Sequence, residues 1–469
     1  MNEFSFSSLT LNAALLKNLE SLDYQVMTEI QAQSLPSILK GKDVIAQAKT
    51  GSGKTAAFGL GLLQHLNVKR FCVQSLVLCP TRELADQVAK EIRRLARNIQ
   101  NIKVLTLCGG TPLGPQVGSL EHGVHIIVGT PGRVEEHLHK GTLTLDRMKI
   151  LVLDEADRML DMGFEPAIDA IVEYAPKSRQ TLLFSATYPD QIRAIAKRIM
   201  AHPISVKATE THDSSTIEQH FYRVDDDASR LTALRLLLLH HRPDSTLVFC
   251  NTKRETQAVA DQLYNLGFNA LALHGDLEQR DREQALVQFT NKSVSILVAT
   301  DVAARGLDID TLSLVINYHL SRELEVHVHR VGRTGRAGNH GVACTLYNEN
   351  ERHRVDNLAD YLDQPIEPSR LPQMGLLKQP SYKAANVTLQ IGGGKKQKVR
   401  PGDILGALTG ADGIKGNQVG KISVFDNRAY VAISRAVAEQ ALEKLTEGKL
   451  KGRTFWVKTI GEGSSWPAR

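Results

Sequence analysis

The segment Ala48-Lys49-Thr50-Gly51-Ser52-Gly53-Lys54-Thr55 constrains this chain more than any other. An apolar run directly before it, Asp43-Val44-Ile45-Ala46-Gln47, predicts a buried strand, and the residues after it predict a helix. A strand, a glycine-rich turn and a helix that opens on Lys-Thr together form the setting of a phosphate-binding loop. The two glycines allow backbone N–H groups to converge, and the helix start adds its positive dipole end. We therefore predict a nucleotide site in which Lys54 reaches the β- and γ-phosphates and the Thr55 hydroxyl binds Mg²⁺.

The predicted nucleotide contacts in this loop are Ala48, Thr50, Gly51, Ser52, Gly53, Lys54 and Thr55. Ala48 stands where such loops usually begin with glycine.

A second signal lies at Ile150-Leu151-Val152-Leu153-Asp154-Glu155-Ala156-Asp157. Four apolar residues lead into acids, as expected of a central strand that delivers carboxylates to the carboxyl edge of a parallel sheet. Asp154 is placed to hold Mg²⁺. Glu155 is placed to orient and deprotonate an attacking water. An acidic surface turn after a core strand is the alternative.

The Asp-Glu-Ala-Asp sequence and the phosphate loop together resemble the DEAD-box RNA helicases of helicase superfamily 2. The resemblance covers Tyr24 to Arg336, with the motifs in the order of that family. It implies an RNA-stimulated ATP hydrolase that uses ATP and Mg²⁺. It also implies an α/β fold with two tandem RecA-like parallel-sheet domains.

Further site residues follow from the same resemblance. Tyr24 and Gln31 lie in a segment that resembles the adenine-reading Q motif, although Met27 replaces the usual proline. The Gln31 amide can both donate to and accept from the N6/N7 edge of adenine. Gly306 and Asp308 are expected to approach the nucleotide from the second domain. Ser185 and Thr187 of Ser-Ala-Thr are expected to bond Asp157 and, with His329, to link hydrolysis to strand separation.

The RNA contacts implied by the resemblance are backbone contacts, which position a strand without reading its bases. They are Pro80, Thr81, Arg82, Gly110, Thr130, Arg133, Arg282 and Thr300.

Three arginines recur in His329-Arg330-Val331-Gly332-Arg333-Thr334-Gly335-Arg336. Their three-residue spacing predicts one basic face on a helical turn. We expect Arg333 and Arg336 to neutralise charge on the γ-phosphate as arginine fingers, which are worth about 10³–10⁵ in rate. A solvated basic face is the alternative.

Alternation of apolar runs with helical patterns predicts parallel sheets. The expected strands are 43–47, 75–79, 104–107, 125–128, 150–153, 181–184, 204–206, 246–250, 270–273, 296–299, 314–317 and 342–346. A helix is expected over 11–22 behind Thr10 as its cap. We expect domains at 1–209 and 217–364, a linker at 365–382 and a third domain at 383–469.

For the third domain the sequence predicts strands 387–391, 421–425, 429–433 and 454–460 and helices 401–408 and 437–445. That order is typical of an RRM-like α+β domain. Arg428 and Tyr430 stand where RNA-stacking aromatic residues are usual, so stacking on the sheet face is not expected. The basic loop 392–400 is expected to bind the RNA instead. The segment is similar to a tail module of bacterial DEAD-box helicases that binds a hairpin of large-subunit ribosomal RNA. We therefore expect 23S rRNA of a large-subunit precursor as the partner.

The charge of the chain is uneven, and this favours an acidic partner. Residues 375–469 hold 16 Lys/Arg and 7 Asp/Glu, a balance of +9, whereas the remainder holds 41 and 44, a balance of −3. Five cysteines without Cys-x-x-Cys pairing disfavour zinc and disulfides. The absence of long apolar runs and of a secretion signal favours a cytoplasmic protein with no membrane partner, and we expect a monomer.

Three functions fit these residues. The first is an ATP-dependent RNA helicase that locally unwinds short duplexes during ribosome biogenesis. The second is an ATP-gated RNA clamp or a general RNA chaperone without rRNA specificity. The third is a DNA translocase of the same superfamily. Intact Lys54, Glu155, Arg333 and Arg336 favour the first.

Overall fold

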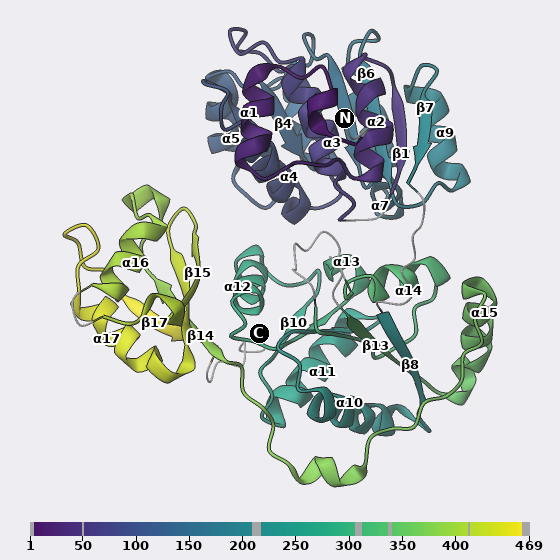
Figure 1. Ribbon diagram of the computed structural model, residues 1–469, viewed down its shortest axis with the longest axis vertical. Helices are drawn as coiled ribbons and strands as arrows, with labels where there is room; N and C mark the ends of the chain where they lie inside the picture. The colour runs from purple at the N-terminus through teal and green to yellow at the C-terminus, as the bar shows by residue number, and fades with distance from the viewer. Residues whose placement is uncertain are drawn as a thin grey trace. The chain divides into compact units, whose positions relative to one another are not determined.

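The structure is a computed structural model that describes residues 4–48, 51–208, 217–304, 312–335, 340–410 and 413–461. Among these residues the chain forms two compact units: the first unit ends at residue 208, and the second begins at residue 217. Figure 1 shows the elements of both units. The second unit contains two sheets, one parallel and one antiparallel.

The first unit is built on a seven-stranded parallel sheet in the order β3-β4-β2-β5-β6-β1-β7. Its strands are β1 Val44–Gln47, β2 Ser75–Leu78, β3 Val104–Leu107, β4 Ile126–Gly129, β5 Ile150–Asp154, β6 Gln180–Ser185 and β7 Ile204–Lys207. Its helices are α1 Ala13–Ser21, α2 Glu29–Leu39, α3 Lys54–Gln64, α4 Arg82–Leu95, α5 Leu113–Glu121, α6 Pro131–His139, α7 Ala156–Asp161, α8 Glu165–Glu173 and α9 Asp190–Ile199.

Both faces of this sheet are covered, and this explains the continuous apolar runs of its strands. On β1, Val44 and Ala46 pack with helices α1 to α4, whereas Ile45 packs with α6, α8 and α9. The two apolar clusters therefore lie on opposite faces, as the alternation of side chains along a strand requires. Helices on each side of the sheet are visible in Figure 1.

The parallel sheet of the second unit has six strands in the order β10-β11-β9-β12-β13-β8. They are β8 Ile217–Arg223, β9 Thr246–Phe249, β10 Ala270–Leu273, β11 Ile296–Ala299, β12 Leu314–Asn317 and β13 Gly341–Tyr347. The helices are α10 Asp227–His241, α11 Lys253–Asn265, α12 Gln279–Thr290, α13 Asp301–Ala304, α14 Leu324–Val331 and α15 Arg352–Leu362.

The C-terminal part of this unit has the predicted β-α-β-β-α-β order and an antiparallel sheet β15-β16-β14-β17. Its elements are β14 Asn386–Ile391, α16 Pro401–Thr409, β15 Val419–Val424, β16 Ala429–Ser434, α17 Ala438–Glu447 and β17 Val457–Ile460. One face packs on α16 and α17 through residues such as Leu389, Ile404 and Leu445. The predicted fold class is confirmed: two parallel-sheet RecA-like domains and a C-terminal α+β domain.

The other face of this antiparallel sheet packs on the end of α12. Thr388 is fully buried, and its Oγ1 lies 2.7 Å from Ser293 Oγ and 3.1 Å from Asn291 Nδ2. Tyr430 and Ile460 of the same face form an apolar cluster with Val287 of α12. We call this contact the docking interface. A face that carries RNA-stacking aromatics in other RRM domains is here covered by the protein itself.

The segment between the parallel sheet and the C-terminal sheet also packs on the second unit. Ser369 N–H donates to the Phe221 carbonyl at 2.7 Å, and Ser381 Oγ donates to the Gly267 carbonyl at 2.7 Å. Leu376 and Tyr382 pack against the apolar cluster of α10 and α11. This segment, expected as a linker, is therefore attached along its length. The exact domain boundaries stay predictions.

Three local expectations differ from the structure. The first helix begins at Ala13 with Asn12 as its cap, because Asn12 Oδ1 accepts from the Leu15 N–H at 2.9 Å; Thr10 is not the cap. Strand β8 was not expected, because it is a half-exposed edge strand whose residues Ile-Glu-Gln-His-Phe-Tyr-Arg lack an apolar run. The last strand begins at Val457 rather than at 454. The linker expected at 209–216 lies outside the described residues.

Candidate nucleotide and RNA site

The motifs of the first unit meet at the carboxyl edge of its sheet, because all seven strands are parallel. In spatial order, β3 leads to Gly110, β4 to Thr130 and Arg133, and β2 to Pro80, Thr81 and Arg82. Next, β5 ends in Asp154, β6 leads to Ser185 and Thr187, and β1 leads to the phosphate loop. The predicted RNA contacts therefore follow β3, β4 and β2, which we call the RNA half of the edge, and the predicted nucleotide contacts follow β5, β6 and β1, which we call the nucleotide half.

The phosphate loop closes on itself through Lys54. Gly53 adopts a left-handed backbone with φ of +90° immediately before α3, a conformation that favours glycine. Lys54 is buried, and its Nζ donates to the Ala48 carbonyl at 2.8 Å. The ammonium thus lies inside the loop, where an incoming phosphate group can exchange with that carbonyl.

Gln31 braces the phosphate loop. Its Oε1 accepts from the Thr28 N–H at 2.9 Å, and its Nε2 donates to the Gly53 carbonyl at 3.0 Å. Thr28 Oγ1 donates to the Ser52 carbonyl at 2.8 Å. Each end of the Gln31 amide therefore makes one bond within the protein, and one N–H and one oxygen lone pair of this amide remain for a further partner. Adenine recognition by Gln31 stays a prediction.

Tyr24, the second residue predicted to contact adenine, is half-buried. Its hydroxyl donates to Glu91 Oε1 at 3.1 Å, its ring meets Phe6 edge-on at 6.0 Å, and the Arg94 guanidinium lies 5.6 Å from the ring centre. Burial, followed by the negative charge of Glu91, raises the pKa of the tyrosine hydroxyl. Three neighbours therefore hold the ring, and two of them, Glu91 and Arg94, lie in the C-terminal half of α4. Stacking of Tyr24 on adenine stays a prediction.

Asp154 and Glu155 are both buried at the end of β5. Glu155 has a left-handed backbone with φ of +54°, which is uncommon for a residue with a side chain and concentrates at functional sites. Its carboxylate lies 3.3 Å from Arg158 Nε. Burial raises the pKa of Asp154 to about 7, although the charge of Lys54 acts in the opposite direction.

These residues fit a divalent cation. Asp154 Oδ1 is buried without a hydrogen-bond partner among the described residues, and a bound cation would supply the missing partner. Carboxylate, hydroxyl and water oxygens are the ligands that Mg²⁺ prefers, and Thr55 adds a hydroxyl at the start of α3.

Asp157 joins the acidic motif to the Ser-Ala-Thr segment. Its Oδ2 accepts from the Ala186 N–H at 3.2 Å and from the N–H and Oγ1 of Thr187, each at 3.0 Å. Ser185 Oγ in turn accepts from the Asp157 N–H at 3.3 Å. Burial alone would raise the pKa of Asp157, but the hydrogen bonds from Thr187 and the charge of Arg158 outweigh it and lower that pKa. The contact that the family resemblance implied is therefore present.

The RNA half of the edge is also braced. The Arg82 guanidinium lies over Gly110, where a Cβ would overlap it, so the glycine makes room for the arginine. Arg133 Nη1 donates to the Thr111 carbonyl and to Gln116 Oε1, each at 3.0 Å. Gln116 Oε1 also lies 2.9 Å from His137 Nε2. Sequence reasoning missed the buried pair Gln116 and His137, because neither belongs to a recognisable motif.

In the second unit, Thr300 and Arg282 meet around α13. Thr300 Oγ1 accepts from the Ala303 N–H at 3.3 Å, and Arg282 Nη2 donates to the Ala303 carbonyl at 3.0 Å. Thr300 follows β11, and Arg282 is in the first turns of α12. The structure thus brings together two predicted RNA contacts that lie 18 positions apart.

The prediction of one basic helical face is wrong for the arginines that the structure describes. Helix α14 ends at Val331, so Arg333 lies beyond it. Arg330 is fully buried: its Nε and Nη2 bind the two carboxylate oxygens of Asp301 at 2.6 and 2.8 Å, and its Nη1 donates to the His319 carbonyl at 2.7 Å. The first arginine is a structural hub. Arg333 is buried, His329 is half-buried, and each makes a side-chain interaction.

Four predicted site residues lie outside the described residues: Thr50, Gly306, Asp308 and Arg336.

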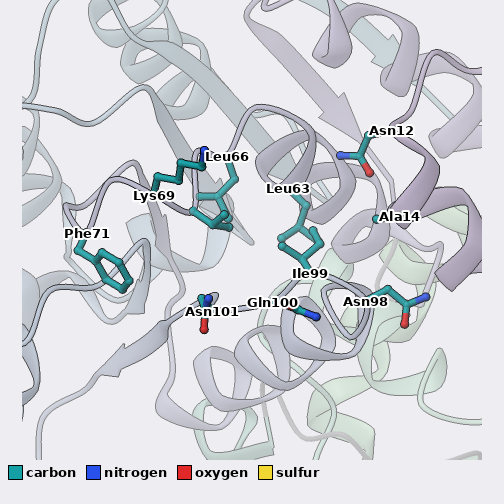
Figure 2. Close-up of a pocket in the computed structure, with 11 residues that line it drawn as sticks. Asn12, Ala14, Leu63, Leu66, Lys69, Phe71, Asn98, Ile99, Gln100 and Asn101 are labelled. Carbon is teal, nitrogen blue, oxygen red and sulfur yellow. The ribbon is translucent and has the colours of Figure 1, made fainter.

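A groove of about 730 Å³ lies elsewhere on the first unit. Figure 2 shows Leu63, Leu66 and Phe71 among its apolar lining residues and Asn12 and Asn101 among its polar ones. Leu63 lies near the end of α3, about 13 Å along the helix from Lys54 at its start, so this groove is separate from the phosphate loop. In the part of the chain that the structure describes, no helix is long and apolar enough to span a membrane. No group of three or more His, Cys, Asp or Glu suited to a metal occurs there either.

Comparison with known proteins agrees with this geometry. Residues 28–195 match the DEAD/DEAH box helicase family, 229–338 the helicase conserved C-terminal domain, and 388–459 the DbpA RNA binding domain. The ATP-dependent RNA helicase DbpA of Escherichia coli is 53% identical over 457 residues, covering 97% of this chain and 99% of that protein. The DbpA of Bacillus subtilis is 36% identical and covers 96% and 98%.

Solved structures give the same result for the helicase core. The structure of Saccharomyces cerevisiae Dbp5 bound to RNA and ADP BeF3 is 31% identical, with a TM-score of 0.71, covering 78% of this chain and 95% of that one. The chain therefore belongs to the DEAD-box ATP-dependent RNA helicases and, within them, to the DbpA type.

Proposed function

We propose that this helicase uses ATP to open short RNA duplexes and that its C-terminal domain directs it to 23S rRNA during assembly of the large ribosomal subunit. The observation that carries the proposal is the divided carboxyl edge of the first sheet. It supports the proposal because β2, which leads to predicted RNA contacts, pairs with β5, which ends in predicted ATP-hydrolysing residues.

The proposed ATP chemistry assigns one task to each residue. Lys54 binds the β- and γ-phosphates, and Glu155 orients and deprotonates the attacking water. Asp154 and Thr55 would hold Mg²⁺, which would supply charge neutralisation at the phosphates. Asp157, through its hydrogen bonds to Thr187, links ATP hydrolysis to strand separation.

Hydrolysis is proposed to need residues from both units. The carboxylates belong to the first unit, whereas Arg333 and Arg336 belong to the second. Two cations that neutralise charge on the γ-phosphate raise the rate only when they are present at the reacting group. RNA that binds to both units would favour this state, which accounts for RNA-stimulated turnover. The two units made as separate chains should together hydrolyse ATP far more slowly than the intact protein.

Targeting is assigned to the C-terminal domain because its charge is suited to RNA. Its loop residues Lys395, Lys396, Lys398 and Arg400 are all exposed, and the match to the DbpA RNA binding domain covers this loop. Phosphate neutralisation by such residues supplies much of the affinity for nucleic acids.

The test is to crosslink the protein to total cellular RNA and to sequence what is retained, beside a variant that lacks residues 386–469. This cut preserves Leu376 and Tyr382, which pack on the second unit. The intact protein should enrich 23S rRNA, whereas the shortened one should retain basal ATP hydrolysis and lose that enrichment. Equal enrichment by both would refute the targeting role.

One observation favours a second candidate, a general RNA chaperone without rRNA specificity. The docking interface covers the middle of the sheet face that reads bases in other RRM domains. Duplex unwinding measured beside ATP turnover, with ribosomal and unrelated RNA of equal length, separates the candidates. Unwinding of both RNAs at equal rates would favour the chaperone.

A further inference from the structure

An exposed tryptophan lies at the rim of the C-terminal sheet. Trp456 directly precedes β17, and 56% of its surface is exposed, which is unusual for an aromatic residue of this size in a small domain. Its carbonyl accepts from the Gly392 N–H at 2.9 Å, so it extends the pairing of β17 with β14 by one position. By the alternation along β14, Gly392 lies on the same face as Thr388 and Gln390, the face used by the docking interface.

The glycines near Trp456 leave the space that two aromatic rings and a backbone carbonyl occupy. A Cβ on Gly392 would overlap the Trp456 indole, and a Cβ on Gly393 would overlap the Phe455 ring. A Cβ on Gly394 would overlap the Phe425 carbonyl. The run Gly392-Gly393-Gly394 is therefore needed for packing, and Gly392 supports one side of the indole while much of the ring remains open.

The docking interface leaves this rim uncovered. Thr388, Tyr430 and Ile460 are at most 6% exposed, because the end of α12 lies over them. Trp456 and Lys458, two residues apart on the same side of β17, are exposed instead. The covered middle removes the usual stacking positions, and the rim keeps an aromatic surface.

The charge around the indole is suited to a polyanion. Lys395 and Lys396 follow the glycine run and are exposed, and Lys458 lies about 7 Å along the strand from Trp456. Among the described residues, Asp426 is exposed in the β15–β16 hairpin beside Lys396, Asp403 lies 3.2 Å from Lys451, and Glu283 of α12 acts on Tyr430 together with Arg280. An aromatic face flanked by lysines is the arrangement with which proteins bind unpaired nucleotides.

We propose that Trp456 is a base-stacking residue: an unpaired RNA base lies on its open indole face, while Lys395, Lys396 and Lys458 bind the flanking phosphates. This inference rests on the proposed function, because it names the contact through which the C-terminal domain holds RNA. It places base contact at the rim of the sheet and leaves the docking interface intact while RNA is bound.

Fluorescence tests the stacking directly. The chain has two tryptophans, so the Trp466→Phe variant leaves Trp456 as the single emitter. Titration of this full-length variant with a 23S rRNA transcript, without nucleotide, should quench the emission in a saturable manner. Unchanged emission at RNA concentrations that saturate binding overturns the proposal. Equal quenching by ribosomal proteins that carry no RNA also overturns it, because the change in emission would then not come from an RNA base.

Affinity provides the second measurement. Trp456→Ala should weaken binding of the same transcript by about 5- to 150-fold, the loss expected for one base–aromatic stack, and Trp456→Phe should recover part of it. Tyr361→Ala is the matched control, because Tyr361 of α15 is 51% exposed and lies outside the C-terminal sheet. Circular dichroism verifies that each variant is folded.

The two hypotheses fail differently. If Trp456→Ala binds like Tyr361→Ala while loss of residues 386–469 abolishes rRNA preference, only the stacking role is overturned. If the loss of residues 386–469 leaves rRNA preference unchanged, the proposed targeting fails, and the stacking role fails with it.

Discussion

Replacing Thr388 with valine should release the C-terminal domain from α12 and the rest of the second unit. Thr388 is fully buried in the docking interface, and valine matches its shape while removing its hydroxyl. The hydroxyl lies 2.7 Å from Ser293 Oγ and 3.1 Å from Asn291 Nδ2. The apolar core of the domain lies on the opposite face of the sheet, so the substitution should leave the domain folded.

The magnitude follows from the groups that lose a partner. Removing one partner of a buried hydrogen bond costs about 1–3 kcal/mol. Asn291 Nδ2 loses its partner in this way, whereas Ser293 Oγ keeps its bond to the Gln288 carbonyl at 3.0 Å, so the docking free energy falls by about 1–3 kcal/mol. Three oxygens on the contacting surfaces, Gln288 Oε1, Asn291 Oδ1 and Gln390 Oε1, already lack a hydrogen-bond partner among the described residues. These unpaired oxygens weaken the interface, and we expect the loss to shift the equilibrium to the undocked form.

Hydrogen exchange and small-angle X-ray scattering measure the release. Amide exchange at the end of α12 should accelerate, and the radius of gyration should increase. Thr446→Val is the matched control, because Thr446 is exposed and its hydroxyl bonds only to the Leu442 carbonyl within α17. If Thr388→Val and Thr446→Val behave alike in both measurements, the assignment of docking energy to these hydrogen bonds is incorrect.

Three further substitutions test the nucleotide half of the edge. Glu155→Gln should retain ATP binding and lower turnover by about 10²–10⁴, and unchanged turnover in a phosphate-release assay would remove its role as base. Lys54→Ala should abolish ATP-dependent unwinding and weaken ATP binding in calorimetry; full affinity would contradict the phosphate loop. Asp157→Asn replaces three charge-assisted bonds by weaker neutral ones, so duplex unwinding should fall more than ATP turnover, and an equal fall would argue against coupling.

Much of the fold could be predicted because a parallel strand that is buried on both faces consists of consecutive apolar residues in the sequence. The expected strands 296–299 and 314–317 have the bounds of β11 and β12, whose residues are all buried. Strand β8 could not be found in this way, because an edge strand that is half-exposed carries polar residues on much of its length.

The candidate site was only partly predictable for a related reason. Motif spacing located Asp157 and Thr187, whose bond the structure shows. Spacing alone could not show that Arg330 is a buried hub, because its partner Asp301 comes from the end of another strand. Nor could it show that Gln31 is bound to the phosphate loop, since that contact depends on how α2 packs against α3.

The neighbouring positions of β2 and β5 have one more consequence. β2 leads to Arg82 and β5 ends at Asp154, and the two strands pair in register from Ser75 with Ile150 to Leu78 with Leu153. Adjacent strands lie about 4.8 Å apart. The proposed RNA contact after β2 and the proposed Mg²⁺ ligand at the end of β5 are therefore separated by a single inter-strand spacing, so the proposed coupling between them needs only one row of hydrogen bonds.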